Sequence, residues 1–260
     1  MELSTDIPKI LILGGTTESR QLAERLAGRR DLEVTLSLAG RTRQPLEQAV
    51  PTRHGGFGGV EGLVSYLQDQ HIRLLVDATH PFAINMSQHA VAAAQITRTP
   101  ILAVRRAPWT AVPGDQWTEV ESADVAIEAL GRTPRNVLIT IGRHGLPALS
   151  QAPQHRYLIR TVDPVEPPLS LPDAQYIQAR GPFAEAAERT LFLAHAIDRV
   201  VAKNSGGEAT YGKLAAARVL QVPVILIRAP TSVDCPCVDS VNAALTHISH
   251  VLGLGIERGV

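Results

Sequence analysis

The sequence predicts an α/β protein made of two doubly wound lobes, each built on a parallel β-sheet. Short runs rich in leucine and β-branched residues alternate with helical patterns along the chain, which is typical of β-α-β units. The two halves also share one order of features: strand, polar loop, Ala-rich helix, X-Pro, and a strand that ends in Arg-Ala-Pro. The matching prolines, Pro100 and Pro223, are separated by close to half the chain. A duplicated α/β unit explains both observations.

The predicted elements follow this repeat. In the first half we expect strands at 9–15, 33–40, 72–80 and 99–106, and helices at 17–29, 60–70 and 84–95. In the second half we expect strands at 136–142, 198–203 and 222–230, and helices at 181–196, 209–220 and 240–253. The join is predicted near residues 131–136, which gives lobes 1–132 and 133–260. The expected architecture is two Rossmann-like lobes with an interlobe cleft, and ligands bind such sheets beyond the carboxyl ends of their strands.

Composition excludes several classes of protein. The chain has 25 basic residues (Lys and Arg) and 25 acidic ones (Asp and Glu), so it lacks the basic surplus of a nucleic-acid binder. No apolar run approaches the roughly 20 residues that span a bilayer, and the N-terminus does not resemble a signal peptide. We therefore expect a cytoplasmic protein with no membrane partner, and a monomer is plausible. Cys235 and Cys237 stand in a loop with no nearby ligand cluster, so no metal is expected.

A glycine turn follows the first predicted strand. Gly14 and Gly15 end the strand, and Thr16, Thr17 and Glu18 open the next helix. Glycines at this place let the backbone approach a pyrophosphate at the helix N-terminus. The pattern is not the full G-x-G-x-x-G, so a tight turn with a threonine cap is the alternative interpretation.

The turn after the second strand suggests which dinucleotide binds. This turn carries hydroxyls and arginines and no carboxylate, at Ser37, Arg41, Thr42 and Arg43. An acid here usually binds the ribose hydroxyls of NAD, whereas arginine suits the 2′-phosphate of NADP. The sequence therefore favours NADPH, although Arg41 and Arg43 could simply be solvated charges.

Two more polar loops follow predicted strands. Asp77, Thr79 and His80 lie in "VDATHPFA", where they could face a cofactor or only cap a turn before Pro81. The segment "KNSGGEATYGK" holds Lys203 and Lys213, which are two of the three lysines, around Asn204, Ser205, Gly206 and Gly207. Backbone amides at such a loop bind anions, and lysine meets scattered carboxylates as a point charge. We predict an anionic-ligand site there; a solvated loop is the alternative.

Together these motifs resemble the precorrin-6A reductase family of cobalamin (vitamin B12) biosynthesis. The matching pieces are "ILGGTTESRQLA", "VDATHPFA", "RGPF" at 180–183 and "KNSGGEATYGK", in the family's order and over nearly the whole chain. The resemblance implies NADPH-dependent reduction of one carbon–carbon double bond in a tetrapyrrole, giving precorrin-6B, with the macrocycle between the lobes. Anaerobic members of the family act on the cobalt-loaded substrate, and the sequence does not separate the two routes. One departure is "AVRRAPW", which leaves the roles of Arg105 and Arg106 open.

The motifs and the resemblance together suggest roles for single residues. Glu18 is expected to hold part of the cofactor. Asp77, Thr79, Arg180, the Asn204–Gly207 loop and both lysines are expected to bind the substrate. His80 and Lys203 are the candidate proton donors, although the electron-poor macrocycle could take its proton from solvent. Trp109, Phe57 and Tyr211 are the aromatic residues available to stack on the macrocycle.

Three other functions compete with this hypothesis. A reductase of a small acid would share the first lobe but would not need the lysine loop. A nucleotide-sensing module would bind NADPH without turnover. A methyltransferase also uses a glycine loop after its first strand, but the Arg-Thr turn argues against it.

Overall fold

The computed structural model describes residues 7–40, 46–230 and 234–254. The chain forms two compact units, of which unit 1 combines Met1–Arg106 with Pro230–Val260, and unit 2 is Ala107–Ala229. Each unit contains a six-stranded sheet, and every strand pair in the two sheets is parallel. The predicted α/β class with two parallel-sheet lobes is confirmed. None of the helices in these ranges is long and apolar enough to cross a membrane.

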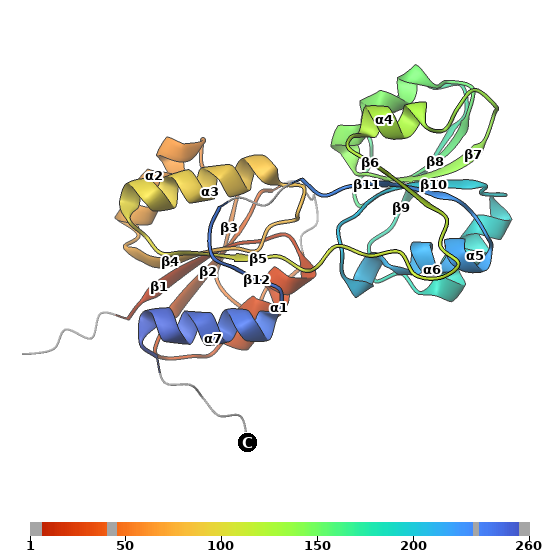
Figure 1. The fold of residues 1–260 in the computed structure, drawn as a ribbon. Helices are drawn as coiled ribbons and strands as arrows, with labels where there is room; N and C mark the ends of the chain where they lie inside the picture. The colour runs from red at the N-terminus through yellow and green to blue at the C-terminus, as the bar shows by residue number, and fades with distance from the viewer. Residues whose placement is uncertain (1–6, 41–45, 231–233, 255–260) are drawn as a thin grey trace, which may run out of the picture. The chain divides into compact units, whose positions relative to one another are not determined.

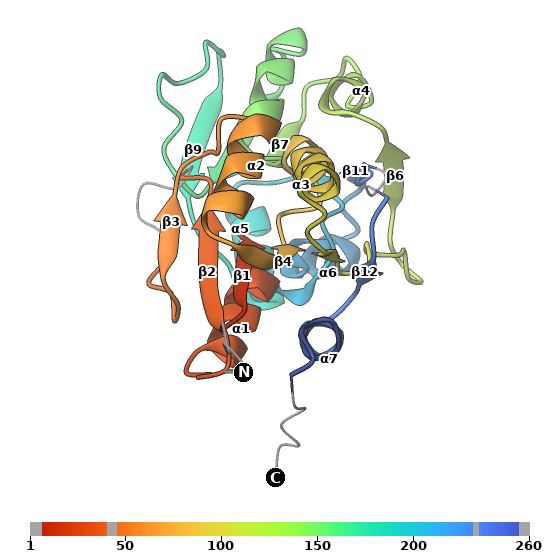
Figure 2. The ribbon, with the colours of Figure 1, turned by 90° about the vertical axis from the view of Figure 1, so that its left-hand side faces the viewer.

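Unit 1 places its first strand near the middle of the sheet. The strand order is β12-β5-β4-β1-β2-β3, and Figure 2 shows β3, β2, β1 and β4 side by side. Helices α2 and α3 cover one face, and α1 and α7 cover the other (Figure 1). The elements are β1 (Lys9–Leu13), α1 (Thr17–Leu26), β2 (Glu33–Leu38), β3 (Thr52–His54), α2 (Val60–Asp69), β4 (Ile72–Asp77), α3 (Ile84–Thr97), β5 (Ile101–Val104), β12 (Cys237–Val238) and α7 (Val241–Leu252).

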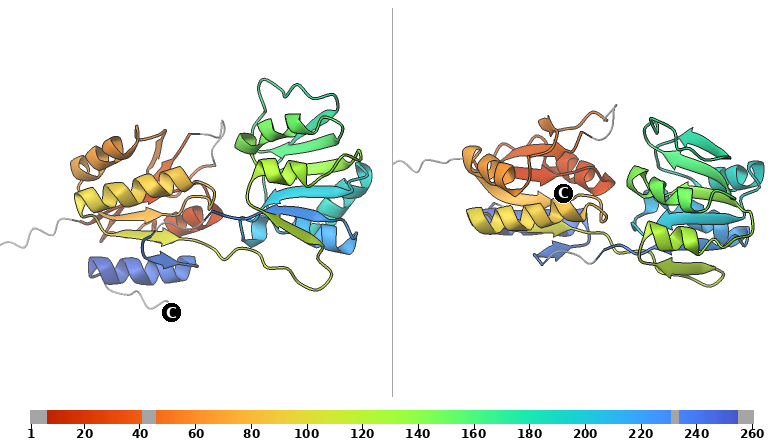
Figure 3. Two further views of the ribbon diagram at one scale, coloured as in Figure 1. Left: turned by 45° about the horizontal axis from the view of Figure 1, so that its top comes forward. Right: turned by 90° about the horizontal axis from the view of Figure 1, so that it is seen from above.

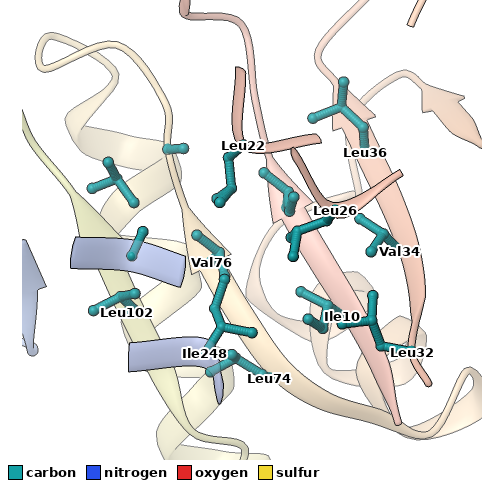
Figure 4. Packing of buried hydrophobic residues seen from close by; sticks show 14 residues of the cluster. Ile10, Leu22, Leu26, Leu32, Val34, Leu36, Leu74, Val76, Leu102 and Ile248 are labelled. Carbon is teal, nitrogen blue, oxygen red and sulfur yellow. The ribbon is translucent and has the colours of Figure 1, made fainter. Parts of the chain in front are cut away.

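The central strand explains why both faces need helices. Side chains alternate between the faces of a strand, and every residue from Ile10 to Leu13 is buried. Ile10 and Ile12 pack with α1 and α7, in the cluster that Figure 4 shows. Leu11 and Leu13 pack on the other face with α2 and α3. An apolar run that is buried on both sides holds β1 in the centre and so fixes the position of the glycine turn that follows it.

Unit 2 repeats this layout with the strand order β6-β11-β10-β7-β8-β9. One of its faces packs on α5 and α6, where Phe192 and Leu214 meet strand residues such as Leu138. The elements are β6 (Trp117–Val120), α4 (Ala123–Glu128), β7 (Asn136–Thr140), the 3-10 helix η1 (Arg143–Gln151), β8 (Arg156–Thr161), β9 (Ala174–Gln178), α5 (Glu185–Ala194), β10 (Arg199–Lys203), the 3-10 turn η2 (Glu208–Thr210), α6 (Gly212–Val219) and β11 (Val224–Ile227).

In each sheet one edge strand, β12 in unit 1 and β6 in unit 2, comes from the other half of the sequence. After β5 the chain enters unit 2, where β6 pairs with β11 and is followed by α4. After β11 the chain returns to unit 1, where β12 pairs with β5 and is followed by α7. In Figure 3 the blue strand β12 lies beside the yellow strand β5. Each half of the sequence therefore supplies one edge strand, and the helix that follows it, to the other unit.

This exchange moves the unit boundaries away from the predicted lobes 1–132 and 133–260. The units change at 106/107 and again at 229/230, and residues 131–136 lie inside unit 2, between α4 and β7. The predicted join marks where the repeat begins again in the sequence. It does not separate the compact units, because β6 and α4 pack with the second half.

Several short elements were not predicted from the sequence, namely β3, β6, β8, β9, β12, α4 and η1. Strands β6 and β9 are only partly buried, as expected for strands at sheet edges, so they lack a continuous apolar run. Strand β8 is buried except at its first residue, but arginine stands at its start and near its end. The predicted pattern was incomplete where burial is one-sided or where charges flank the run.

Candidate functional site

The carboxyl edge of the unit 1 sheet brings the predicted cofactor loops together. In the register of the sheet, Leu13 lies between Ser37 of β2 and Asp77 of β4, so the turns after these three strands are neighbours. The Gly14 amide donates to the Ser37 carbonyl at 2.9 Å, and the Thr16 hydroxyl donates to the Ala78 carbonyl at 2.8 Å. Strands β1 and β4 flank the point where the strand order reverses, which is where ligands bind sheets of this kind.

The glycine turn has the geometry that a close ligand approach requires. A Cβ on Gly14 would stand 2.6 Å from Leu36 Cδ1, so a larger residue here would require that side chain to shift. Gly15 is exposed and has φ of +119°, which L side chains rarely adopt, and a Cβ there would meet nothing within 4 Å. Thr16 caps α1 in a capping box with Ser19. The Thr16 cap is thus present, and the Gly15 backbone beside it is exposed. These residues fit a pyrophosphate bound at the N-terminus of α1.

Glu18 takes part in an ion pair that the sequence did not reveal. Its two carboxylate oxygens accept from Arg106 Nη1 at 3.0 and 2.9 Å, and both side chains are largely buried. Arg106 is the last residue before the chain enters unit 2. Glu18 therefore anchors the end of the segment that follows β5, and its contact with a cofactor stays a prediction.

Asp77 is the centre of a buried polar network. Its side chain is fully buried, forms an ion pair with Arg105, and accepts from the Thr79 hydroxyl at 2.7 Å. Arg105 also donates to the Asp77 carbonyl and to the Ser87 hydroxyl of α3, both at 2.7 Å. The departure "AVRRAPW" thus supplies the cation that compensates this carboxylate. Asp77 and Thr79, predicted as substrate ligands, are less than a tenth exposed and engaged here, so their direct role with substrate remains untested.

His80 lies at the same edge and is half-buried. Its Nδ1 accepts the Phe82 amide at 3.2 Å, as the turn-capping alternative expects. A neutral imidazole that accepts at Nδ1 carries its proton on Nε2. Proton donation by His80 would need the imidazolium form, whose Nδ1–H cannot accept the Phe82 amide, so this role stays a prediction.

The turn after β2 is described only in part. Ser37 is buried, and its hydroxyl accepts from Arg53 Nη1 at 3.0 Å. Arg41 and Thr42, the other residues predicted to bind the 2′-phosphate, lie outside the described residues. Arg53 was not predicted as a site residue, because only the pairing of β2 with β3 places it beside Ser37.

Unit 2 presents a second polar edge at the end of β10. Asn204 is buried, and its side chain accepts from the Trp109 amide at 2.8 Å and donates to the Trp109 carbonyl at 2.9 Å. The Trp109 indole N–H donates to the Gly207 carbonyl at 3.0 Å. Gly206 and Gly207 have φ of +64° and +78°. The loop is therefore fixed by Trp109, which follows the entry of the chain into unit 2.

The predicted cations of unit 2 differ in exposure. Arg180 is exposed, Lys203 is half-buried at the end of β10, and Ser205 is buried. Lys213, which the sequence predicts to bind the substrate, is buried. It is 4% exposed, its ammonium donates to the Thr210 carbonyl at 2.6 Å, and it lies 4.8 Å from the centre of the Trp109 ring. The cause is that α6 is buried on most sides, so its second residue points into packed structure.

The other candidates in the sequence have simple surroundings. Of the aromatic residues available for stacking, Trp109 is buried beside Tyr211, and Phe57 lies under the Arg53 guanidinium. Cys235 and Cys237 are free thiols, and burial raises the pKa of both. Within the described ranges, no group of three or more His, Cys, Asp or Glu side chains is placed to hold a metal.

The fold and these edges define a two-lobed Rossmann-like α/β protein with a glycine turn at the switch point of its first unit. The chain matches the family model described as Precorrin-6x reductase CbiJ/CobK over residues 9–249, and it belongs to this family. The family resemblance that the sequence motifs indicated is confirmed.

Individual relatives agree with this assignment. The chain is 53% identical over 245 residues to a precorrin-6A reductase of Sinorhizobium sp, covering 94% of each chain. It is 50% identical over 222 residues to a precorrin-6A reductase of Rhodobacter capsulatus, covering 85% of this chain and 88% of that protein. A solved structure described as CobK precorrin-6A reductase superposes with a TM-score of 0.91 at 45% identity, covering 97% of this chain and all of that one.

Proposed function

We propose that this protein is an NADPH-dependent reductase that reduces one carbon–carbon double bond of precorrin-6A to give precorrin-6B in cobalamin biosynthesis. The observation that carries the proposal is the family match over residues 9–249, because it includes both polar edges. Relatives named precorrin-6A reductase align with 85% or more of the chain at 50–53% identity. Such a biosynthetic role also fits the cytoplasmic location that the sequence predicts.

The edge of unit 1 suits the cofactor. The exposed Gly15 backbone and the N-terminus of α1 can receive a pyrophosphate, and Ser37 stands where the adenosine ribose is expected. When bound, the dinucleotide supplies the hydride, and the protein supplies binding and orientation. The network of Asp77 and Arg105 fixes the β4 turn, and Thr16 ties that turn to the glycine loop.

The edge of unit 2 suits a substrate with several carboxylate arms. Lys203, Arg180 and the backbone amides of residues 205–207 are the groups proposed to bind these arms. Asn204 acts through Trp109, because it holds the tryptophan backbone against this loop. The substrate contact predicted for Lys213 would first require its buried ammonium to leave Thr210 and Trp109.

His80 is the first candidate for the proton that must reach the carbon next to the hydride acceptor, and Lys203 is the second. If His80 donates this proton, His80→Ala should lower kcat about 100-fold or more. His250→Ala, at an exposed position in the last turn of α7, is the control and should stay near wild type. A loss of less than threefold in His80→Ala would remove this residue from the reaction.

The function is tested by incubating the pure protein with precorrin-6A and NADPH while recording the nicotinamide and macrocycle absorbances together. Equal molar changes in both, with a weaker reaction in NADH, support the proposal. NADPH binding without any change in the macrocycle spectrum would favour a sensing module. Oxidation of NADPH only by small acids would favour the other reductase, and binding of S-adenosylmethionine would favour a methyltransferase.

A further inference from the structure

Arg53 occupies a position in unit 1 that the established family membership does not explain. It lies in the middle of β3, a short edge strand, and is paired in register with Ser37 of β2. The Ser37 carbonyl in turn accepts the Gly14 amide at 2.9 Å. Arg53, Ser37 and the glycine turn therefore follow one another along the carboxyl edge of the sheet.

The Arg53 guanidinium is held in a defined place. Nη1 donates to the Ser37 hydroxyl and to the Gly55 carbonyl, both at 3.0 Å, and Nη2 donates to the Gly56 carbonyl at 3.1 Å. The Phe57 ring lies 3.8 Å from the guanidinium carbon, and the Tyr66 ring centre lies 5.3 Å away. These contacts orient the guanidinium over the end of β2 and reduce the entropy lost when it binds a ligand.

The charge of Arg53 has different surroundings from the other arginines at this edge. Arg105 is compensated by Asp77 and Arg106 by Glu18. The three hydrogen bonds of Arg53 to the described part of the chain all end on neutral oxygens, although the residue is only partly exposed. A half-buried cation that is positioned by neutral acceptors favours an anionic ligand next to it.

We propose that Arg53 binds the 2′-phosphate of NADPH and determines the preference for the phosphorylated dinucleotide. The inference rests on the proposed function, since it requires an adenine dinucleotide on the unit 1 edge. In folds of this class the adenosine ribose lies at the end of the second strand, where Arg53 meets Ser37. Because the Ser37 hydroxyl accepts from Arg53, its own proton can be donated to another phosphate oxygen.

The test compares two probes that differ only in this phosphate, 2′-phospho-ADP-ribose and ADP-ribose, by titration calorimetry on the full chain. Arg53→Gln should weaken the phosphorylated probe at least tenfold and ADP-ribose less than threefold. Arg53→Lys keeps the charge but not the planar fork, so it should show an intermediate loss. Arg73→Gln is the matched control, because Arg73 is exposed near the start of β4, at the other end of the sheet.

A second readout uses turnover. The ratio of kcat/KM for NADPH to kcat/KM for NADH should fall at least tenfold in Arg53→Gln and stay near wild type in Arg73→Gln. If Arg53 has a purely structural role, Arg53→Gln should lower kcat/KM for NADPH and for NADH by the same factor and leave this ratio unchanged. If Arg53→Gln does not fold, Arg53→Lys gives the same comparison with a smaller change.

The possible failures are distinct. If wild type prefers the phosphorylated probe and Arg53→Gln retains that preference, Arg53 is not the phosphate ligand, and the proposed function stands. If the variant weakens both probes equally, Arg53 is structural and the inference is overturned. If wild type itself does not distinguish the probes, the NADPH assignment fails, and the inference fails with it.

Discussion

The two units fix the loops after the equivalent strands β4 and β10 by different chemistry. In unit 1 the last residue of β4 is Asp77, a buried carboxylate held by Arg105. In unit 2 the last residue of β10 is Lys203, and the loop after it is held by neutral hydrogen bonds between Asn204 and the Trp109 backbone. One strand order thus supports an ion-pair network at one edge and an amide clamp at the other.

The ion pair offers the largest test of this contrast. Arg105→Met leaves Asp77 buried without its partner, which we expect to lower the free energy of unfolding by about 3 kcal/mol or more. The measurement is urea denaturation of the full chain. The double variant Arg105→Met/Asp77→Asn removes both charges and should recover a large part of this loss. A single-variant cost below about 1 kcal/mol would contradict the assigned network.

The hydrogen bonds between Asn204 and the Trp109 backbone should contribute less to the free energy of unfolding than the ion pair does. Asn204→Ala leaves the buried Trp109 N–H and C=O without these partners, and we expect a loss of about 2 kcal/mol. Tryptophan fluorescence should also change, because the indole bonded to Gly207 is less constrained. Gln116→Ala, which removes an exposed hydrogen bond to Gln221, is the control and should cost less than about 0.5 kcal/mol. Equal effects in the two variants would mean that the clamp is not important for stability.

The smallest expected effect is on the pH dependence of stability, to which a buried histidine of unit 2 contributes. The residue before the second strand is Leu32 in unit 1 and His155 in unit 2, and both are buried. Burial lowers the pKa of His155, opposed by the Gly131 backbone. In the unfolded chain His155 has the ordinary histidine pKa of about 6.5, so just below this pH the unfolded chain binds more protons than the folded one. Acidification from pH 6.5 to the lowered pKa of the folded state therefore reduces the free energy of unfolding, by at most about 1.4 kcal/mol per pH unit.

His155→Leu isolates this contribution. The variant should lose less stability than wild type between neutral pH and mildly acidic pH, measured by denaturation at each pH. Because the other histidines titrate in both proteins, their effect cancels in the difference. Parallel pH profiles would show that His155 does not carry this acid sensitivity.

The sequence predicted those features that depend on local patterns. Gly14, Gly15 and the Asn204–Gly207 loop follow apolar strands, and parallel strands bring their carboxyl ends to one edge, so the positions of both loops could be predicted. The partner of Asp77 could not be found in this way, because Arg105 lies 28 residues away and only the pairing of β4 with β5 brings them together.

Other features could not be predicted because burial and strand pairing are tertiary properties. Lys213 was predicted to bind the substrate, but its burial was not foreseen, because the small residues around it allow α6 to pack deeply. Arg53 was overlooked because β3 has three residues and no apolar run. The lobe boundary was misplaced because the repeat can be detected in the sequence, whereas the pairing of β6 with β11 cannot.

The exchanged strands also affect how the protein is made. The sheet of unit 1 receives β12 and α7 only after the ribosome has translated residues 237–252. Until then β5 is an unpaired edge of the nascent unit 1 sheet. Strand β6 is also unpaired, because its partner β11 has not yet been synthesised. A chain cut between α4 and β7 would give two fragments, each holding a strand that belongs to the other. Neither unit can therefore complete its sheet during synthesis without the C-terminal part of the chain.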